Sequence, residues 1–538
     1  MANFTYNRRR FLIQSSSLGI GLGSTALGLS ACGGNEAAAP AIGVGDSARP
    51  KITSGIQIGD VTNGQAVVWA RTDRVAKLRV EYDTTDAFRN SRLAVGPTVT
   101  EASDYTGRIT LTNLPEGQTV FLRVSYEAPD NARAVSEPVI GRFRTARIQN
   151  GDAPIRFVWG ADVAGQGWGI NPDFGGMKIY EAMRQRQPDF FIHCGDTIYA
   201  DGPIAPEVKA ENGRIWKNIV TPEVSKVAET LNEFRGRYRY NLMDVNVQRF
   251  SAEVPQIWQW DDHEVVNNWS PSKDLSADTR YSEGSLLAIL PRATRAFLEY
   301  SPMRWGTTPD TQRIYRQIPY GPLLDVFVLD MRSYRGPNGT NLETVESGNT
   351  AFLGKAQVEW LKKALLASQA TWKIIAADMP IGLRVPDGKT ASGQDRWEAI
   401  ANGNDGVPLG RELEMAGLLR DIKTVSNVVW LTADVHYCAA HYYDPGKAQF
   451  TDFSPFWEFV AGPLNAGTFG PNELDATFGP QLVFQKVPPA GQVNLSPFSG
   501  YQFFGEVNID PKTKALTVDL RDIDGKSQYS KVINPVSV

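Results

Sequence analysis

Six short runs of apolar and β-branched residues constrain the fold more than any other feature of the sequence. Each run has the length of a buried strand, and longer stretches with helical character separate the runs. This alternation is typical of a layered α/β domain, in which the central strands are covered on both faces. The runs cover residues 155–160, 189–194, 254–260, 323–329, 372–377 and 427–432.

An acidic residue follows each of these runs within two positions. These residues are Asp162, Asp196, Asp261 with Asp262, Asp330, Asp378 and Asp434. A single Asp at a strand end is commonly a turn former or a helix cap, but its recurrence at six strand ends needs another explanation. Carboxylates gathered at the carboxyl edge of a sheet repel one another unless a cation lies among them. The sequence therefore predicts a metal centre at this edge.

Histidines support the same prediction. The chain has four, and three of them lie in these segments: His193, His263 and His436. His436 follows Asp434 by two positions, and residues two apart on an extended backbone point to the same side, so we expect both to serve adjacent metal ions. Tyr199, on the turn after Asp196, is expected to enter the same site. His193 precedes its strand end, and we interpret it as structural.

The first 32 residues are typical of an export signal. Arg8 and Arg9 precede an apolar stretch interrupted by Gly and Ser, which is the pattern of a twin-arginine signal. A membrane-spanning helix is disfavoured because those residues dilute the hydrophobicity. Residues 29–32 resemble a lipobox in which Cys32 would carry a lipid anchor, and cleavage beside an incidental cysteine fits equally well. We expect recognition by the twin-arginine export machinery and a periplasmic, envelope-associated or secreted protein.

Two further segments precede the α/β region. Residues 33–50 are rich in Gly, Ala and Pro and predict a linker. Residues 51–147 contain several short alternating runs separated by turn residues, which predict a small fibronectin- or immunoglobulin-like β-sandwich.

Composition narrows the classes of function. The chain of 538 residues carries 55 Lys and Arg against 59 Asp and Glu, which argues against a nucleic-acid-binding surface. Its three cysteines cannot form a disulfide framework.

Five motifs together resemble a known family. They are Gly-Ala-Asp at 160–162, Gly-Asp-Thr-Ile-Tyr-Ala-Asp at 195–201, Trp-Asp-Asp-His-Glu at 260–264, Leu-Asp-Met-Arg-Ser-Tyr-Arg at 329–335 and Ala-Asp-Val-His at 433–436. The set is similar to the PhoD-type alkaline phosphatases, relatives of the purple acid phosphatases in the calcineurin-like metallophosphoesterase superfamily. The resemblance implies a four-layer αββα sandwich over residues 151–525, with two metal ions.

The resemblance also implies which side chains hold the metal ions. One ion would be bound by Asp162, Tyr199 and His436, the other by Asp262 and Asp434, and Asp196 would bridge them. Asp378 falls where relatives have a further histidine ligand, and a capping role fits it equally well. The better-known members carry a cysteine in the first motif, which this chain lacks.

The oxygen-rich donor set suits Fe³⁺ with Ca²⁺, or with Mg²⁺ or Mn²⁺, better than two Zn²⁺ ions. A tyrosinate ligand particularly favours a trivalent metal ion.

Catalytic roles follow from the same set. Asp262 and His263 form the expected catalytic pair, with His263 near the leaving group as proton donor or electrostatic stabiliser, and a purely structural role as its alternative. Arg332 matches phosphate oxygens, but a salt bridge to Asp330 or Asp261 is equally compatible.

Asn268 is the second expected substrate-binding residue, because its side chain is suited to hydrogen-bond a phosphate. Capping of the segment that follows is the alternative.

The expected function is hydrolysis of phosphate esters by a metal-activated water at a two-metal centre. One alternative is a phosphodiesterase or phospholipase-D-like hydrolase, because specificity depends on loops that the scaffold does not fix. Another is a non-catalytic envelope lipoprotein whose β-sandwich binds a partner.

Overall fold

The computed structural model describes residues 45–62, 64–147, 152–304 and 313–536. The predicted export signal and the predicted lipid anchor at Cys32 lie outside these residues. Within them, no helix is both long enough and apolar enough to cross a membrane.

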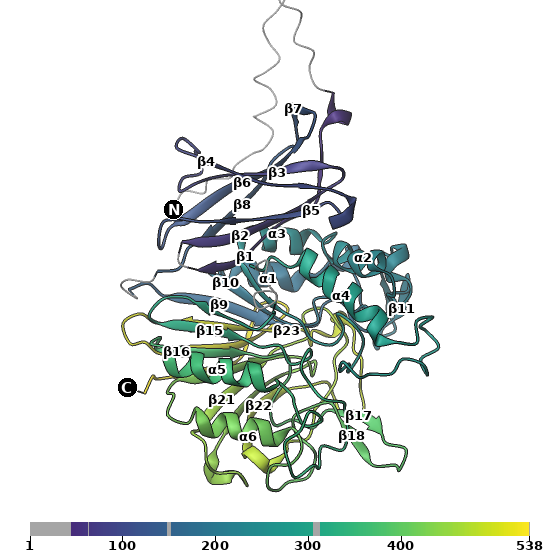
Figure 1. Ribbon diagram of the computed structural model, residues 1–538, viewed down its shortest axis with the longest axis vertical. Coiled ribbons are helices and arrows are strands. Elements are labelled where there is room, and N and C mark those ends of the chain that lie inside the picture. Colours follow the sequence, from purple (N-terminus) through teal and green to yellow (C-terminus); the bar gives the residue numbers. More distant parts are fainter. Residues whose placement is uncertain (1–44, 63, 148–151, 305–312, 537–538) are drawn as a thin grey trace, which may run out of the picture. The chain divides into compact units, whose positions relative to one another are not determined.

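Two large sheets form the centre of the α/β region (Figure 1). The first has nine strands in the order β25-β24-β23-β9-β10-β13-β1-β2-β5, and the second has seven in the order β14-β15-β16-β19-β21-β20-β22. Apolar side chains from both sheets form one continuous core between them, including Phe157 and Ile192 from the first sheet and Val326, Ile374 and Leu431 from the second.

The strands of the first sheet are β1 (Ile52–Thr62), β2 (Gln65–Thr72), β5 (Thr106–Leu111), β9 (Ile155–Gly160), β10 (Phe190–Cys194), β13 (Gln256–Gln259), β23 (Phe503–Ile509), β24 (Leu516–Asp522) and β25 (Ser527–Ile533). Those of the second are β14 (Arg316–Pro319), β15 (Leu324–Val328), β16 (Trp372–Ala376), β19 (Val428–Thr432), β20 (Cys438–Tyr443), β21 (Phe456–Val460) and β22 (Pro480–Lys486).

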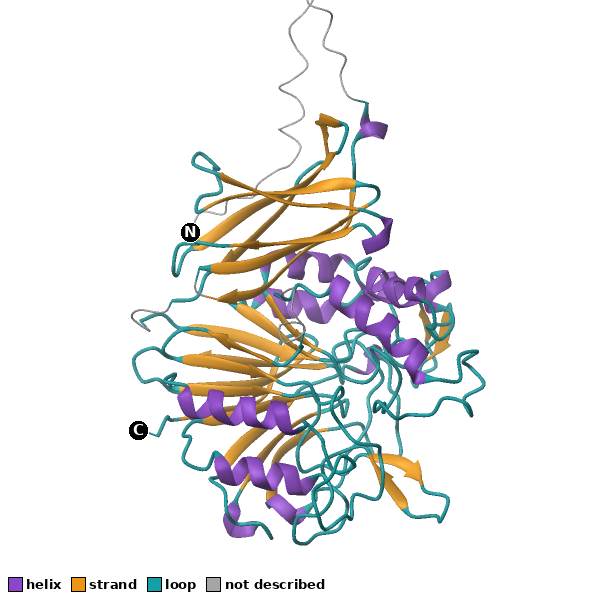
Figure 2. Cartoon of the chain, in the orientation of Figure 1, coloured by secondary structure: helices purple, strands orange, loops and turns teal. Residues whose placement is uncertain are grey.

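Helices cover the outer faces of the two sheets (Figure 2). Those that pack against the nine-stranded sheet are α1 (Lys178–Gln185), α2 (Leu231–Asn241), α3 (Val245–Glu253) and α4 (Leu286–Tyr300). Those that pack against the seven-stranded sheet are α5 (Lys355–Ala367) and α6 (Glu412–Asp421). The layers therefore run helix, sheet, sheet, helix, and the predicted αββα fold class is confirmed.

All six strands expected from the apolar runs are present, as β9, β10, β13, β15, β16 and β19. β9, β10 and β13 pair in parallel, and so do β15, β16, β19 and β21. Because parallel strands end on the same side, the Asp residues that follow them share one edge of their sheet.

The N-terminal region is a β-sandwich, as predicted. One layer consists of β3 (Ala76–Asp83), β4 (Arg92–Val99), β6 (Thr119–Ala128), β7 (Asn131–Val135) and β8 (Val139–Arg144). Its apolar side chains pack against those of β1, β2 and β5.

This sandwich shares a sheet with the α/β region, which the sequence analysis did not anticipate. β1 pairs in parallel with β13 through Gly59 and Gln256. A Cβ at Gly59 would lie 2.3 Å from the carbonyl oxygen of Pro302 and 2.8 Å from that of Gln256. Only glycine permits this approach of the two backbones, and the sheet continues through it.

Two small hairpins complete the fold. β11 (Glu207–Lys209) pairs with β12 (Ile215–Lys217), and β17 (Pro386–Lys389) pairs with β18 (Asp395–Trp397). The second hairpin projects from the body of the fold (Figure 1).

Candidate metal centre

The predicted ligands lie in the loops that follow the parallel strands, and four of them have a left-handed backbone. The φ angles are 68° for Asp162, 50° for Asp196, 64° for Asp434 and 62° for His436. Such conformations are unfavourable for residues other than glycine and tend to cluster at functional sites. The expected extended geometry of Asp434 and His436 is therefore wrong, since the backbone turns immediately after β19.

The first group of side chains contains Asp162, Asp196 and His436, which offer ligand atoms within 4.8 Å of one another. Tyr199 joins this group, because its hydroxyl lies 2.9 Å from Nε2 of His436. Nδ1 of His436 donates to the carbonyl oxygen of Gly467, which fixes the tautomer and leaves Nε2 as an acceptor. Burial lowers the pKa of His436 to about 4, so the ring is neutral, as a metal ligand must be.

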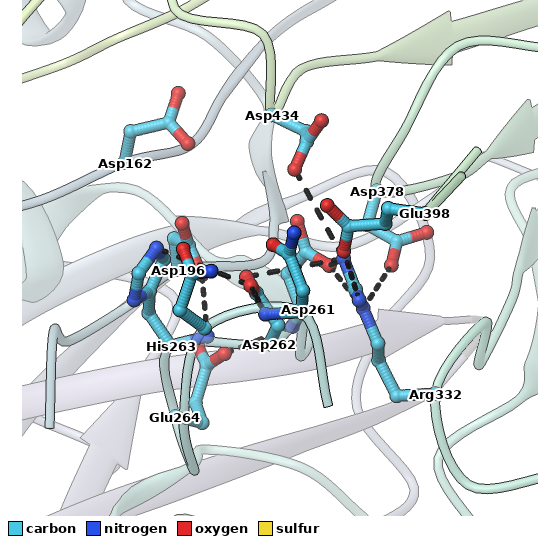
Figure 3. A network of polar contacts seen from close by, with 12 residues as sticks. Asp162, Asp196, Asp261, Asp262, His263, Glu264, Arg332, Asp378, Glu398 and Asp434 are labelled. Carbon is cyan, nitrogen blue, oxygen red and sulfur yellow. Dashed lines mark hydrogen bonds and ion pairs between the residues drawn. The ribbon is translucent and has the colours of Figure 1, made fainter. Parts of the chain in front are cut away.

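Two further groups continue from the first, each sharing one residue with the group before it. Asp196, Asp262 and His263 form one, and Asp261, Asp262 and Asp434 form the other, again with ligand atoms within 4.8 Å. Figure 3 shows Asp196, Asp261 and Asp262 between His263 and Arg332. Asp196 and Asp262 each belong to two groups, so the three groups form one continuous cluster, and the predicted ligand Asp378 lies beside it, 3.4 Å from Arg332.

Several buried carboxylate oxygens of the cluster accept no hydrogen bond. Both carboxylate oxygens of Asp162, both of Asp378, and Oδ1 of Asp262 are buried without a hydrogen bond. Oδ1 of Asp162 lies 3.6 Å from Nε2 of His436, the ring nitrogen that carries no proton in this tautomer. A buried polar atom without a partner is costly, and a buried charge is more so. These carboxylate oxygens fit metal ions, because a bound cation would supply the partner that no hydrogen bond provides.

The pKa values of the clustered carboxylates also indicate a site for cations. Burial, together with the charges of neighbouring carboxylates, raises the pKa of Asp162 to about 8 and raises those of Asp196 and Asp434 well above the ordinary range. These carboxylates cannot all be ionised near neutral pH unless positive charge is added. The donor set, rich in carboxylates with one phenol and one imidazole, is suited to hard cations.

The ring of His263 is held by two neighbouring side chains. Its Nδ1 lies 2.6 Å from Oδ1 of Asp201, and the ring of Tyr199 stacks on it at 4.1 Å between centroids. Burial disfavours a charged ring, but the charges of Asp201, Asp262 and Asp196 raise the pKa of His263 well above its ordinary value. Nε2, the other ring nitrogen, lies 4.0 Å from Oδ2 of Asp262.

Arg332 is fully buried among carboxylates. Its guanidinium contacts Asp261 at 2.5 Å and Asp378 at 3.4 Å. It forms a further ion pair with Glu398, the residue that directly follows β18. The salt bridge to Asp261 that the sequence left open is present. A role of Arg332 in substrate binding stays a prediction, because in this arrangement its guanidinium is engaged by the protein.

Asn268 is also engaged. Its backbone N–H donates to Oδ2 of Asp262, and its side-chain amide donates to Oδ1 of Asp387 at 2.9 Å. Asp387 lies in β17 and accepts a second amide, from Asn338, at 2.9 Å. The side chain of Asn268 therefore ties the loop after β13 to the hairpin, and its contact with substrate stays a prediction.

Two residues of the expected pattern lie apart from the cluster. Asp330 accepts hydrogen bonds from Trp260 Nε1 and from the Ser333 backbone, both at 2.9 Å, and so stabilises a turn. His193 packs edge-to-face against Phe191 and Trp258, and burial lowers its pKa to about 3. Neither belongs to the groups of candidate ligands.

Three acidic residues received no role among the expected ligands. Asp201 orients His263, and Glu398 pairs with Arg332. Glu264 accepts from the backbone and hydroxyl of Thr197, both at 2.6 Å, and from the Asp261 backbone at 2.8 Å, which joins the loops after β10 and β13. Asp201 and Glu264 stand within the quoted motifs, whereas nothing local in the sequence marks Glu398.

The family of the chain follows from comparison with known proteins. A family model described as PhoD-like phosphatase matches residues 157–520, and a model described as the N-terminal domain of PhoD-like phosphatase matches residues 37–147. The chain belongs to the PhoD-like phosphatase family. The match includes every loop that carries a residue of the cluster.

The chain is also similar to a curated relative, and its fold is similar to two solved structures. The chain is similar to alkaline phosphatase D of Bacillus subtilis (strain 168), with 29% identity over 316 residues that span 55% of this chain and 50% of that protein. The aligned region is thus only half of the relative's length.

The fold resembles a structure of PhoD with a TM-score of 0.66 and 20% identity, covering 90% of this chain and 89% of that one. It also resembles purple acid phosphatase PPD1 from yellow lupin (Lupinus luteus) seeds, with a TM-score of 0.54 and 12% identity, covering 90% of this chain and 74% of that one.

Proposed function

We propose that this chain is a metal-dependent phosphoesterase that hydrolyses phosphate esters at a two-metal centre. The observation that supports it most directly is the cluster of buried carboxylate oxygens without hydrogen-bond partners in loops that belong to a phosphatase family. The side chains that would hold the metal ions are Asp162, Asp196, Tyr199, Asp262, Asp378, Asp434 and His436.

When bound, such metal ions supply Lewis acidity that activates a water molecule and draws charge from the phosphate oxygens. The donor set favours Fe³⁺ together with Ca²⁺, and Mg²⁺ or Mn²⁺ are the next candidates for the second ion. Supporting observations are the number of carboxylates and the position of Tyr199 next to His436.

His263 is the proposed proton donor. Asp201 accepts from Nδ1 and holds the ring in one orientation, while Tyr199 packs against its face. A proton on Nε2 is then available to the leaving oxygen of the ester, and Asp201 stabilises the charged ring before transfer. Asp262, 4.0 Å from Nε2, places this donor beside the candidate ligands.

Phosphodiesters are a second candidate substrate class, and Arg332 is the observation that favours them. A monoester carries a dianionic terminal phosphate and needs cationic groups around it, whereas a diester carries one negative charge. Because the guanidinium of Arg332 is already paired with Asp261 and Glu398, it adds little free positive charge to the site.

The test combines metal content with activity. Elemental analysis of the purified protein should find two metal ions per chain, and kcat/KM should be compared on p-nitrophenyl phosphate and its bis-ester. Asp262→Ala should lose metal and turnover together, whereas His263→Ala should keep the metal and lose about 10²–10⁴-fold in kcat. Asp330→Asn, a strand-end Asp outside the cluster, is the matched control and should keep its metal.

A protein without metal and without esterase activity after reconstitution with iron and calcium would refute the proposal. The non-catalytic envelope lipoprotein would then be the better interpretation.

Export by the twin-arginine machinery is a separate proposal, supported by the paired arginines alone. Replacing Arg8 and Arg9 with Lys should leave folded precursor in the cytoplasm, and unchanged export would contradict it. Cys32→Ala tests the lipid anchor, because a lipoprotein should shift from the membrane fraction to the soluble exported fraction.

A further inference from the structure

Lys273 lies close to the candidate metal centre, and within the described residues its side chain makes one hydrogen bond. Its Nζ donates to the carbonyl oxygen of Asn267 at 2.5 Å. The residue is partly buried. Among the residues that the structure describes, no carboxylate oxygen lies within 4.0 Å of Nζ.

The carbonyl that Lys273 contacts belongs to the same peptide group as the N–H of Asn268. That N–H donates to Oδ2 of Asp262, one of the proposed ligands. An ammonium group that binds the carbonyl oxygen of a peptide group polarises that peptide group. The N–H of the same peptide group then becomes a stronger donor, because hydrogen bonds in a chain reinforce one another. The charge of Lys273 acts on Asp262 through space, and this single peptide group adds a bonded route between the two residues.

This peptide group is fixed in place by its neighbours. The N–H of Asn267 donates to Asp201 at 2.9 Å, and the side chain of Asn268 donates to Asp387 at 2.9 Å. Asn268 adopts a left-handed conformation with φ of 53°, and its N–H donates to Asp262. With Oδ2 of Asp262 bound in this way, Oδ1 is the oxygen that accepts no hydrogen bond, and it lies 3.8 Å from Nη2 of Arg332.

We propose that Lys273 is a positioning residue for the metal centre, which acts through the 267–268 peptide group to hold Asp262 with Oδ1 free for a cation. This inference rests on the proposed function, because it requires that Asp262 bind a metal ion. Contacts of this kind fix the orientation of a ligand, and their loss typically weakens metal binding 10- to 100-fold.

Lys273→Met, Lys273→Arg and the control Lys362→Met form the test. Lys362 is a partly exposed lysine on α5 that pairs with Asp421 at 2.9 Å, so its loss removes one positive charge outside the candidate metal centre. Mn²⁺ is titrated into chelator-treated protein by calorimetry, and urea unfolding of the metal-free protein is followed in parallel.

We expect Lys273→Met to weaken one of the two Mn²⁺ sites about 10- to 100-fold, with an unchanged urea midpoint for the metal-free protein. Lys273→Arg should bind within about threefold of the unmodified chain, since a guanidinium also donates to a carbonyl. Lys362→Met should bind both ions normally.

Equal binding by Lys273→Met and the unmodified chain would overturn the inference, as would failure of Lys273→Arg to restore affinity. A parallel loss of both Mn²⁺ sites and of the urea midpoint would assign Lys273 a purely structural role and overturn it too. An unmodified chain that binds no Mn²⁺, Ca²⁺ or iron would instead refute the proposed function, which separates the two failures.

Discussion

Replacing Arg332 with Met removes the principal buried cation of the cluster while keeping a side chain of similar length. The guanidinium is fully buried and pairs with Asp261 at 2.5 Å, Asp378 at 3.4 Å and Glu398. Removing one partner of a buried ion pair leaves the other charge uncompensated and typically costs about 3–5 kcal/mol. We therefore expect Arg332→Met to lower the free energy of unfolding of the metal-free protein by about this amount.

Urea unfolding of the metal-free protein is the suitable assay, because urea does not screen charge. The double variant Arg332→Met/Glu398→Gln should recover about 0.5–3 kcal/mol, since it also removes one of the stranded carboxylates. Arg420→Met is the control: Arg420 is half exposed and lies 3.4 Å from Asp421, so its loss should cost no more than about 1 kcal/mol.

Kinetics distinguish this structural role from substrate binding. If Arg332 held the substrate phosphate, Arg332→Met would raise KM for p-nitrophenyl phosphate and leave stability nearly intact. A loss of less than about 1 kcal/mol together with a raised KM would refute the reasoning from the buried ion pairs.

Three further predictions follow from individual residues. Burial, with the charge of Asp475, raises the pKa of Glu412 to about 8, so the folded state holds a proton that the unfolded state releases near pH 4.5. The stabilising contribution of Glu412 is complete below about pH 4.5 and is lost as the pH rises to about 8. Glu412→Gln should therefore unfold at nearly the same urea concentration as the unmodified chain at pH 4.5, and should be more stable than it by up to about 5 kcal/mol at pH 9. Equal stability of the two proteins at both pH values would contradict the raised pKa of Glu412. Gly59→Ala should lower the free energy of unfolding by about 1–3 kcal/mol, because its Cβ would meet two backbone oxygens, and an unchanged urea midpoint would show that β1 and β13 can separate freely. Tyr199→Phe should abolish any visible iron-to-tyrosinate absorption of the native protein while keeping the ring that stacks on His263, and a colour that persists would place the phenolate elsewhere.

The sequence by itself determined the central strands and the residues at their ends. Six apolar runs predicted β9, β10, β13, β15, β16 and β19, because a buried strand requires a short unbroken apolar segment that can be recognised locally. The acidic residues that follow these runs, with His263 and His436, marked the edge where the candidate metal centre lies. The family motifs led to the same fold.

Only the tertiary structure decided which of these residues meet. The pattern places Asp330 and Asp378 alike, yet Asp330 stabilises a turn with Trp260 while Asp378 enters the cluster beside Arg332. The alternation rule failed at Asp434 and His436, because the rule holds for an extended backbone and both residues are left-handed.

Contacts between residues distant in the sequence could not be predicted from local sequence patterns either. Glu398 reaches Arg332 from a hairpin that no strand signal connects to the site, and β1 joins β13 only where Gly59 lets the two backbones approach. Short-range periodicity records which residues are buried within an element, whereas the partners of a buried charge are set by how distant elements pack. The sequence therefore determined the ligand types and the edge of the sheet, and the packing of loops across that edge determined the geometry of the centre.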